Sequence, residues 1–582
     1  MVLLTILFTL LALPVALTIW SAQSLAQNRA KAKATGLPYI ERWISPMNPF
    51  WLLCGSRFVR LCERLGIATE NMSRIYSYGW EANTRAEVHK HVGSDVFIVV
   101  HPGGLQLCVA DSAVTYDILQ RRRDFRRNME EMAVLNVYGK NLSTTDDEEW
   151  QRHRKMTGVT FTEKNNELVW KQSLSQTEGM LEFWTKRCKQ PIRSTHEDTK
   201  VFTLNVLAAA MFDKVYPFEG KSEENESKHE GDTSYMYRAS LSTILGSIIQ
   251  IFILGEEGLK AWWTPKSWKG AAEAMVTFRS YILHLMNEER TYIKQGRTDR
   301  QHLVARLVRA IEADEKTNDA ALDKLAEENT ITKNVNMTEE EIISNLFVYA
   351  FAGNDTTAIA LTSILYHLAA NPQSQEWIAE ELQYYLTSSD TSTWSFENFK
   401  KLKRCGAVIM ETLRICHPLS QLVKTTGPAP QPLKYNGETY IVPPGTSVHC
   451  SIPALHANPK YWGPDPLAWN PSQHISASRS QGIELGVFES EVLAPDTSEH
   501  YLAWAWGQRV CPGKRFSQVE LVAVLAALLR DWKVEVVPEP GETKEGAMRR
   551  AWECSLKVDH EGHMLHEMVD PESVGLRWVK RA

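Results

Sequence analysis

The chain has 582 residues, of which 43% are hydrophobic and 23% charged, with 64 Lys and Arg against 70 Asp and Glu. These fractions exclude a disordered or low-complexity protein, and the net charge of −6 lacks the basic excess of a nucleic-acid-binding protein. The nine Cys show no C-x-x-C spacing, which argues against a disulfide framework or a zinc ribbon.

The N-terminal segment is apolar and long enough to span a membrane. Residues 1–28 contain no charged side chain, and the run from Val2 to Trp20 is almost entirely aliphatic or aromatic. As a helix, this run covers about 28 Å, close to the thickness of a hydrocarbon core. The small residues at 24–26 would also fit a cleaved signal peptide, but no basic residue precedes the run. Basic residues at 29–33 follow it instead, which favours a retained anchor with the rest of the chain in the cytosol.

The sequence divides into three parts. We expect a membrane anchor at 1–28, a basic and Pro-rich linker at 29–50 and one large domain at 51–582. Hydrophobic periodicity and Pro or Gly boundaries predict that this domain is mainly α with small β-sheets. The helices are predicted at 146–156, 163–189, 270–295, 300–327, 338–370, 374–386, 397–415 and 513–532, and the strands at 94–100, 106–109, 438–442, 446–450 and 533–537.

The strongest chemical motif runs from Trp504 to Phe516, with the sequence WAWGQRVCPGKRF, and leads straight into an apolar helix. Pro512 suits the first helical position, so Cys511 should lie where unpaired N–H groups and the helix dipole point at its sulfur. These features lower the pKa of a thiol and stabilise the thiolate. A thiolate in this setting is either a nucleophile or a metal ligand.

Two glycines flank this cysteine and decide between explanations of the motif. Gly507 and Gly513 allow the loop to turn sharply and let another group approach the sulfur closely. A phosphate-binding loop is excluded, because five residues and not four separate the glycines, and Arg515 stands where Ser or Thr must hold magnesium. A buried, inert Cys is the common explanation for a lone Cys, but the glycines and Arg509 argue against it here.

A capping box begins the predicted helix 338–370, which is apolar except at its middle. Gly353, Asp355 and Thr356 interrupt the apolar sequence there. The Thr356 hydroxyl can bond back to a carbonyl and open the helix locally, and an acid beside a hydroxyl can relay protons. An exposed polar turn is the alternative, but the apolar residues on both sides argue against it.

Two further pairs are weak signals when taken alone. Glu411 and Arg414 are i,i+3 neighbours on a predicted helix, and Trp150 and Arg154 are i,i+4 neighbours. Charged pairs of this kind usually lie on solvated faces and contribute little to stability.

In their order and spacing, these motifs resemble the cytochrome P450 family of haem-thiolate monooxygenases. The resemblance covers residues 35–582 and, with the apolar N-terminus, is to the membrane-bound eukaryotic type. It implies a single large haem-thiolate fold in which Cys511 is the metal ligand, binding the iron of haem b axially, and Gly513 lets the haem approach. The residues that it implies for contacts with the haem propionates are Trp150, Arg154, Lys424 and Arg509.

The resemblance also gives roles to the two remaining motifs. Asp355 and Thr356 would deliver protons to dioxygen at the haem. Glu411 and Arg414 would lock the helix that supports the haem-binding loop.

Three positions depart from the family pattern. Trp504 replaces the usual Phe, and Lys424 stands where an Arg is common, which keeps the charge but loses the bidentate fork. Gln473 replaces the Arg that adds a second cation to the Glu411 pair. The Gln473 amide can still donate two hydrogen bonds, so we expect a working substitute. His474 is a further donor in principle, although adjacent side chains normally point apart.

The function implied is insertion of one oxygen atom of O2 into a small lipophilic metabolite, as in fungal secondary-metabolite biosynthesis. The chain carries no flavin or nicotinamide domain, so the electrons of NADPH would come from a separate NADPH–cytochrome reductase, with cytochrome b5 as an optional second donor. The expected location is the endoplasmic reticulum membrane, single-pass, with the catalytic domain in the cytosol.

The alternative is a haem-thiolate isomerase or dehydratase, or a non-catalytic haem protein, which uses no external electrons. The pair Asp355 and Thr356 discriminates between the two, because a protein that does not activate dioxygen needs no proton relay there.

Overall fold

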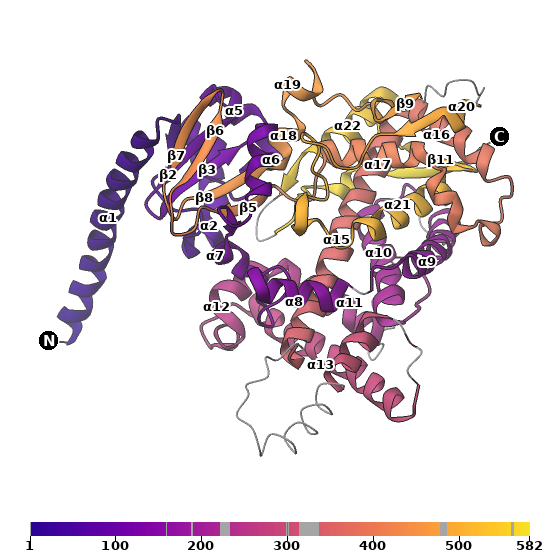
Figure 1. The fold of residues 1–582 in the computed structure, drawn as a ribbon, viewed down its shortest axis with the longest axis horizontal. Coiled ribbons are helices and arrows are strands. Elements are labelled where there is room, and N and C mark those ends of the chain that lie inside the picture. The colour runs from indigo at the N-terminus through magenta and orange to yellow at the C-terminus, as the bar shows by residue number, and fades with distance from the viewer. Residues whose placement is uncertain are drawn as a thin grey trace.

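The structure is a computed structural model of the chain, drawn in Figure 1. It describes residues 2–158, 160–187, 190–220, 233–297, 300, 302–312, 337–477, 486–559 and 564–581. At 2–11, 187, 233–235 and 559 it describes the backbone alone. The second half of the predicted helix 300–327 therefore lies outside the described residues.

Helices make up most of the described chain, and each predicted helix and strand has a counterpart there. The longer helices are α1 (Val2–Thr35), α2 (Pro49–Arg64), α6 (Ser112–Gln120), α8 (Asp147–Gly158), α9 (Glu163–Glu182), α10 (Thr195–Phe212), α11 (Thr233–Gly246), α12 (Ile248–Lys260), α13 (Lys266–Lys294), α15 (Glu339–Ala370), α16 (Pro372–Tyr385), α17 (Lys403–Ile415), α21 (Lys514–Leu529) and α22 (Lys544–Leu556). Shorter helices are α3 (Glu70–Ile75), α4 (Trp80–Thr84), α5 (Glu87–Val92), α7 (Met129–Met132), α18 (Ile452–His456), α19 (Pro459–Trp462) and α20 (Val487–Ser490). Sequence analysis missed α10 and α22 among others, and the predicted helix 397–415 is divided into a 3₁₀ turn at Phe396–Lys400 and α17.

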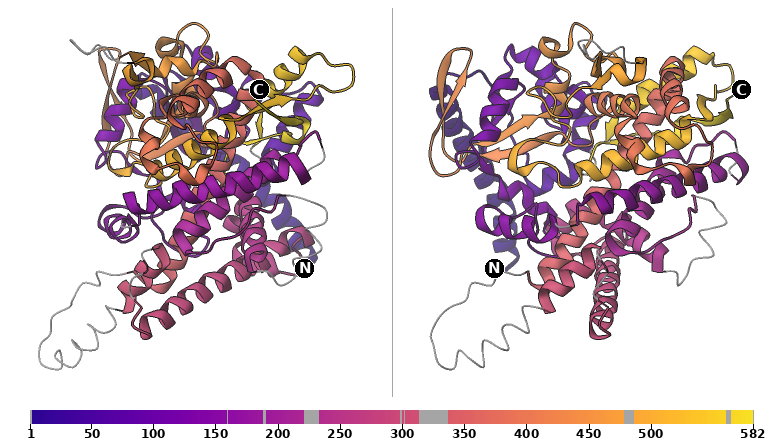
Figure 2. Two further views of the ribbon diagram at one scale, coloured as in Figure 1. Left: turned by 90° about the vertical axis from the view of Figure 1, so that its right-hand side faces the viewer. Right: turned by 45° about the vertical axis from the view of Figure 1, so that its right-hand side comes forward.

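The helix α15 runs through the centre of the molecule. Its sequence is apolar on all faces, which is typical of a helix buried on every side, and nearly all of its side chains from Ile342 to Ala369 are buried. Its N-terminus has the predicted capping box, in which Thr338 and Glu341 each bond the backbone N–H of the other. The views in Figure 2 show the orange and yellow C-terminal half of the chain at one end of the molecule and the pink helices around α13 at the other.

A six-stranded sheet lies on the side of the molecule next to α1 (Figure 1). Its strands in spatial order are β1 (Tyr39–Glu41), β2 (Val96–His101), β3 (Gly104–Val109), β8 (Ser447–Ser451), β5 (Gln421–Thr425) and β4 (Arg126–Arg127). The pairs β1–β2 and β3–β8 are parallel and the others antiparallel. The register of β4 against β5 sets Arg127 opposite Lys424, which brings two cations to one edge of the sheet.

Within the described residues, the remaining strands form two-stranded antiparallel sheets. They pair β6 (Gln431–Tyr435) with β7 (Glu438–Val442), β9 (Ile475–Ala477) with β10 (Glu491–Leu493), β11 (Trp532–Val536) with β14 (Leu576–Lys580) and β12 (Val558–Asp559) with β13 (Glu567–Met568). The fold is thus mainly helical with small sheets, as predicted.

The segment expected to be a linker at 29–50 is largely part of the domain. The helix α1 continues through it to Thr35, and residues 39–41 form the edge strand β1. Asn28 is buried and donates to the carbonyl of His101 at 2.9 Å, while Arg29 binds both carboxylate oxygens of Glu41 at 2.6 and 2.7 Å. These contacts dock the end of α1 on the sheet.

No single helix within the described residues is long and apolar enough to cross a membrane. The segments Met236–Gly246 and Ile248–Lys260, bent by 102°, meet the length and composition requirement only as a pair. The side chains of the first half of the predicted anchor lie outside the described residues.

Candidate active site

Cys511 lies in the loop that leads into α21. The helix begins at Lys514 with Gly513 as its N-cap. The prediction that Pro512 is the first helical residue is therefore wrong. The backbone of Gly513 (φ −84°, ψ 6°) is not yet helical, which delays the start. Gly507 has φ 76°, a conformation that favours glycine, and makes the predicted sharp turn. The Cys511 N–H then closes the loop on the carbonyl of Trp504 at 2.9 Å.

The Cys511 thiol is accessible to solvent and yet surrounded by protein atoms. Burial raises its pKa, whereas the N–H groups of Gly513 and Lys514 and the charge of Arg154 lower it. The helix N-terminus thus acts in the predicted direction, but burial outweighs it and the pKa is raised overall. The prediction of a lowered thiol pKa is wrong for the protein alone. A bound metal cation would deprotonate such a thiol outright.

A cavity of about 690 Å³ lies beside this loop and is rich in cations. Its lining comprises Leu119 to Asp124, Lys424 and Trp506 to Arg509. Lys424 is 6% exposed, and its ammonium group makes no hydrogen bond or ion pair with a described residue. Burial and the neighbouring charge of Arg127 lower the pKa of Lys424 to about 8.

Arg127, which sequence analysis did not select, is a second cation whose pKa is lowered in the same way as that of Lys424. Burial lowers its pKa to about 10, and its Nε atom is buried without a hydrogen-bond partner. Like charges directly opposite each other on paired strands are unfavourable, so Arg127 and Lys424 leave the protein short of negative charge at this edge.

The predicted propionate contacts converge on the same region. The Arg509 guanidinium donates to the Thr145 carbonyl at 2.8 Å and to Asp146 at 2.5 Å, and it lies 4.4 Å from the ring centroid of Trp150. Arg154, one turn after Trp150 on α8, acts electrostatically on Cys511 and makes no hydrogen bond or ion pair with a described residue. The acidic first turn of α8 stabilises the helix N-terminus.

The middle of α15 has one accessible face. Ala352 is exposed and Gly353 and Thr356 are half-buried, although the helix around them is buried. The Thr356 hydroxyl donates to the Ala352 carbonyl at 2.6 Å, as predicted, but the helix continues unbroken and the predicted local opening does not occur. Gly353 is required for close packing, because a Cβ atom there would lie 2.7 Å from a methyl group of Leu207.

Asp355 lies inside the protein beside this face. Its carboxylate accepts one hydrogen bond, from the amide of Asn354 at 3.1 Å. Burial raises its pKa to about 7, against the charge of Lys200, which lowers it. The Lys200 ammonium is in turn paired with Glu567 at 3.2 Å. A carboxyl group with this pKa can bind and release a proton near neutral pH.

Glu411 and Arg414 form a completely buried ion pair on α17. The guanidinium binds both carboxylate oxygens, at 2.8 and 2.9 Å, and its remaining N–H groups donate to the carbonyls of His456, Pro466 and Ala468. Burial alone would raise the pKa of Glu411, but hydrogen bonds from Arg414 and His474 lower it to about 2.

Gln473, which departs from the family pattern, and its neighbour His474 both contact the Glu411–Arg414 pair. The Gln473 amide donates to Glu411 at 2.8 Å, as predicted, and His474 Nε2 lies 2.9 Å from the same oxygen. Adjacent side chains converge because residues 471–474 form a 3₁₀ turn. His474 is 5% exposed whereas Gln473 is exposed, so the histidine, which sequence analysis named only as a further donor in principle, is the buried partner.

A second cavity, of about 110 Å³, is lined mainly by apolar side chains such as Trp51 and Phe252. It contains a charged pair that sequence analysis did not find: His449 Nε2 lies 3.1 Å from a carboxylate oxygen of Glu131. Burial alone would lower the pKa of His449, but Glu131 and Glu81 raise it to about 9.

Comparison with known proteins identifies the family. The family model described as Cytochrome P450 matches residues 87–551. The chain belongs to the cytochrome P450 family. Family membership makes it a monooxygenase enzyme and implies haem as its cofactor.

Fungal cytochrome P450 proteins are among its relatives. A cytochrome P450 monooxygenase of Arthrobotrys oligospora is 26% identical over 90% of both chains, and one of Penicillium rubens is 26% identical over 88% of both. A cytochrome P450 monooxygenase of the phomenoic acid biosynthesis cluster of Leptosphaeria maculans is 25% identical over 89% of this chain and 90% of that one. The crystal structure of the cytochrome P450DA heme domain superposes with a TM-score of 0.61 at 15% identity, covering 85% of this chain and 92% of that one.

The residues present fit a haem. Lys424 is buried and Arg127 is half-buried, and neither forms an ion pair with a residue that the structure describes. The two carboxylates of haem b would supply the anions that these cations lack. Cys511 is exposed in the same loop, and the cavity of about 690 Å³ that Lys424 and residues 506–509 line is large enough for part of a porphyrin.

Proposed function

We propose that the protein is a haem b monooxygenase that inserts one oxygen atom of O2 into a small lipophilic metabolite of a biosynthetic pathway. The observation that carries this proposal is the unpaired buried charge of Lys424 at the loop of Cys511. The similarity to the monooxygenase of the phomenoic acid biosynthesis cluster of Leptosphaeria maculans supports a biosynthetic pathway, and the apolar lining of the second cavity supports a lipophilic substrate.

The chain's own groups would hold the cofactor. When bound, haem supplies an iron centre for dioxygen activation, to which a thiolate ligand donates electron density. Cys511 would bind the haem iron through its sulfur, and Gly513 would leave room beside that sulfur. The propionates would be held by Trp150, Arg154, Lys424 and Arg509.

The accessible face of α15 would handle protons. Asp355 has a pKa of about 7 and would take up and release them near neutral pH. Because the Thr356 hydroxyl donates its own hydrogen to Ala352, its oxygen is free to accept a hydrogen bond from a group on that face. A haem-thiolate isomerase or dehydratase would have no use for this arrangement.

We also propose that NADPH–cytochrome reductase supplies the electrons, with cytochrome b5 as an optional second donor.

We further propose that the protein is a single-pass protein of the endoplasmic reticulum membrane with its catalytic domain in the cytosol. In support, the large apolar side chains from Leu13 to Trp20 on α1 are 53–62% exposed, and basic residues follow at 29–33.

The reaction is tested with the purified protein, reductase and NADPH under ¹⁸O2, using a panel of lipophilic natural products. We expect a product that carries one ¹⁸O atom and forms only with NADPH. Conversion without NADPH or O2 would favour the isomerase or dehydratase alternative.

The role of Thr356 is tested with Thr356→Ala, in which NADPH oxidation should continue while peroxide replaces product. An unchanged ratio of product formed to NADPH consumed would remove Thr356 from the mechanism.

The anchor is tested by deleting residues 1–22, which leaves the contacts of Asn28 and Arg29 intact. We expect the shortened protein to leave the membrane fraction and keep its haem spectrum. A full-length protein found in the soluble fraction, with its N-terminus cut near Ala26, would show that the segment is a signal peptide.

A further inference from the structure

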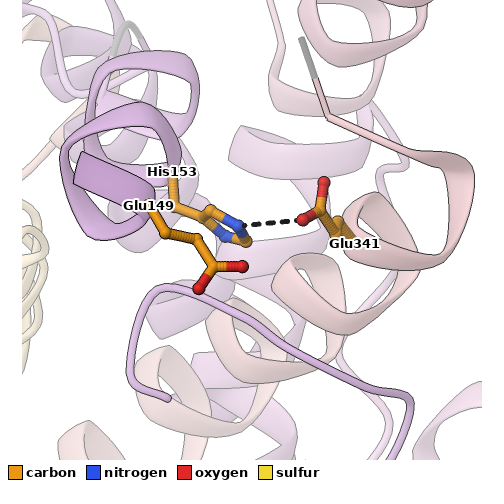
Figure 3. A group of neighbouring side chains, drawn as sticks. All are labelled: Glu149, His153 and Glu341. Carbon is orange, nitrogen blue, oxygen red and sulfur yellow. Dashed lines mark ion pairs between the residues drawn. The ribbon is translucent and has the colours of Figure 1, made fainter. Parts of the chain in front are cut away.

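Three ionisable side chains meet between α8 and α15, close to the predicted haem contacts. Glu149 and His153 come from α8 and Glu341 from α15 (Figure 3). One nitrogen or oxygen atom from each lies within 4.8 Å of the others. His153 is fully buried, and its Nε2 has only a long contact of 3.4 Å with Glu341. Histidine nitrogen and carboxylate oxygen atoms are both ligands that zinc accepts, so a metal ion is the first occupant to consider.

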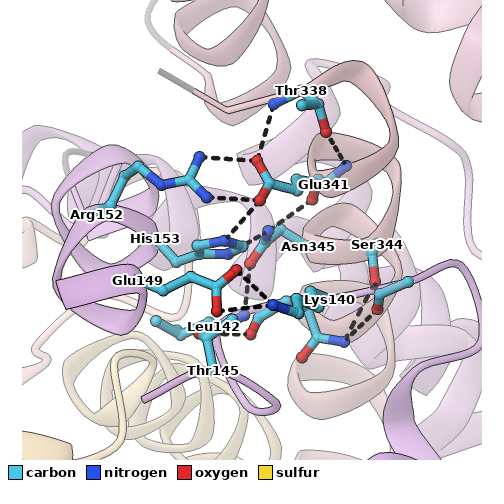
Figure 4. A network of polar contacts seen from close by, with 12 residues as sticks. Lys140, Leu142, Thr145, Glu149, Arg152, His153, Thr338, Glu341, Ser344 and Asn345 are labelled. Carbon is cyan, nitrogen blue, oxygen red and sulfur yellow. Dashed lines mark hydrogen bonds and ion pairs between the residues drawn. The ribbon is translucent and has the colours of Figure 1, made fainter. Parts of the chain in front are cut away.

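The orientation of the Asn345 amide decides against a metal. Its Oδ1 accepts from the N–H of Leu142 at 2.9 Å, and its Nδ2 donates to the carbonyl of Glu341 at 2.6 Å (Figure 4). Reversing the amide would set its NH2 against an N–H and its oxygen against a carbonyl. The Nδ2 group is therefore also the donor in the 3.0 Å contact with His153, whose Nδ1 must carry the lone pair.

The neutral imidazole of His153 consequently carries its proton on Nε2, directed at Glu341. Binding a metal through Nε2 would move that proton to Nδ1, where it would face the N–H of Asn345. Both carboxylates are also paired already, since Arg152 binds Glu341 at 2.6 and 2.8 Å and Lys140 lies 3.1 Å from Glu149. The carboxylates and the Nδ1 atom of His153 therefore already have partners within the protein, and the 3.4 Å contact between Nε2 and Glu341 is the one long link of the group.

This network is part of a polar seam between the two helices. The seam pairs three residues of α15, spaced by four and so on one face, with three of α8: Glu341 with Arg152, Asn345 with His153, and Tyr349 with Thr157 at 2.8 Å. The rest of α15 is apolar, and apolar surfaces can slide past each other. Directional buried hydrogen bonds cost desolvation, but they can specify one register.

The register matters because both helices lead to the candidate active site. Trp150 and Arg154 lie on α8 on either side of His153. Asn345 also holds Leu142, whose carbonyl accepts from Arg509 at 3.5 Å. A shift of α8 along α15 would therefore move Trp150 and Arg154 directly, and it would displace the 142–145 segment whose carbonyls accept from Arg509.

We propose that His153 and Asn345 are positioning residues that set the register of α8 and of the 142–145 segment on α15, and so hold Arg154 and Arg509 in place for the haem propionates. This inference rests on the proposed haem-binding function.

The test uses variants that separate the hydrogen bond of His153 with Asn345 from its longer contact with Glu341. In His153→Asn the side-chain oxygen can replace Nδ1 as the acceptor for Asn345. In His153→Gln the longer amide can replace the donor to Glu341 but not that acceptor. His153→Ala removes both. Thr362→Val is the matched control, because it deletes a buried 2.8 Å hydrogen bond of the same helix to Thr199 on α10, away from α8.

The readout is the rate at which haem leaves the ferric protein for apomyoglobin, with thermal melting recorded in parallel. Loss of one directional hydrogen bond predicts haem release about five-fold faster in His153→Ala and His153→Gln. His153→Asn and Thr362→Val should release haem at nearly the wild-type rate, although the control melts at a lower temperature. Equal rates in all four variants, or a rate that follows melting temperature alone, would overturn the proposal.

Two further outcomes are informative. Zn²⁺ added to the wild type in a calorimeter should give no binding that is lost in His153→Ala, and such binding would overturn the assignment of the imidazole proton. A wild type that binds no haem would defeat the proposed function itself, whereas normal haem binding with unaffected variants defeats only the role of His153.

Discussion

Two buried charged regions of this protein differ in whether the chain itself satisfies their charges. At Glu411 and Arg414, each carboxylate oxygen and guanidinium N–H group of the pair has protein partners, and the carboxyl pKa falls to about 2. At Lys424 and Arg127, two cations face each other and neither forms an ion pair within the described part of the chain, and the lysine pKa falls to about 8. The first region is complete as a structural element, whereas the second is complete only with a ligand. Burial and pairing therefore separate a supporting network from a binding site more clearly than residue type does.

The largest effect is expected from breaking the complete network. Glu411→Ala or Arg414→Ala leaves an uncompensated buried charge, which typically costs about 3–5 kcal/mol. We expect no folded holoprotein, measured by expression yield and circular dichroism. A variant that folds and melts like the wild type would show that the pair does not support the structure.

The same pair predicts a pH dependence of stability. Because the pKa of Glu411 is about 2 when folded and 4.5 is its usual value, its contribution is present above pH 4.5 and is lost as the pH falls toward 2. Acid unfolding followed by fluorescence should show this loss, and lowering the pH from 8 to 6 should leave the contribution unchanged.

The two residues beside the pair should differ in importance. His474 is buried and Gln473 is exposed, so His474→Ala leaves a buried acceptor short of a donor at a cost of about 1–3 kcal/mol, and Gln473→Ala costs less. Thermal melting of the two holoproteins measures the difference. A larger loss in Gln473→Ala would make the amide, and not the imidazole, the third member of the network.

The incomplete region should respond in the opposite way. Lys424→Met removes a buried cation, so the haem-free protein should become more stable while haem affinity falls about 10- to 100-fold, as for a lost hydrogen bond to a charged group. Between pH 8 and 10.5 the unfolded lysine binds more protons than the folded one, so the wild-type apoprotein should gain stability as pH rises, and the variant should not. Melting of both apoproteins and haem titration test this, and lower stability of the variant would contradict it.

The smallest effects are expected at the glycines of the Cys loop. Gly507→Ala places a side chain at φ 76° and should cost about 1 kcal/mol of folding free energy. Gly513→Ala meets no strained backbone, but its methyl would lie 3.9 Å from the Cys511 sulfur. It should leave apoprotein melting unchanged and weaken haem binding. Equal melting losses in both variants would remove this distinction.

Local sequence predicted the parts of this site that depend on neighbours along the chain. The capping box of α15, the back-bonded Thr356, the Glu411–Arg414 pair and the Cys loop are each formed by residues within a few positions of one another. The sequence motifs therefore predict them. Two details were not predictable in this way: the exact start of α21, which follows from the backbone of Gly513, and the pKa of Cys511, which burial raises.

The parts that sequence analysis missed come from long-range packing. Arg127 meets Lys424 through strand pairing, Glu567 holds Lys200 across the domain, and His449 meets Glu131 across 318 positions. No local pattern marks such partners. The prediction of a linker at 29–50 rests on the Pro residues at 38, 46 and 49, which follow α1, whereas the contacts of Asn28 and Arg29 with the sheet leave no local pattern.

The central claim is that Cys511 binds haem iron as a thiolate beside the unpaired cations. The most direct measurement is the difference spectrum of the reduced, CO-treated protein, for the wild type and Cys511→Ala. Thiolate ligation predicts a red-shifted Soret band in the wild type and its loss in the variant, while circular dichroism shows that both are folded. The same red-shifted band in Cys511→Ala would contradict the account.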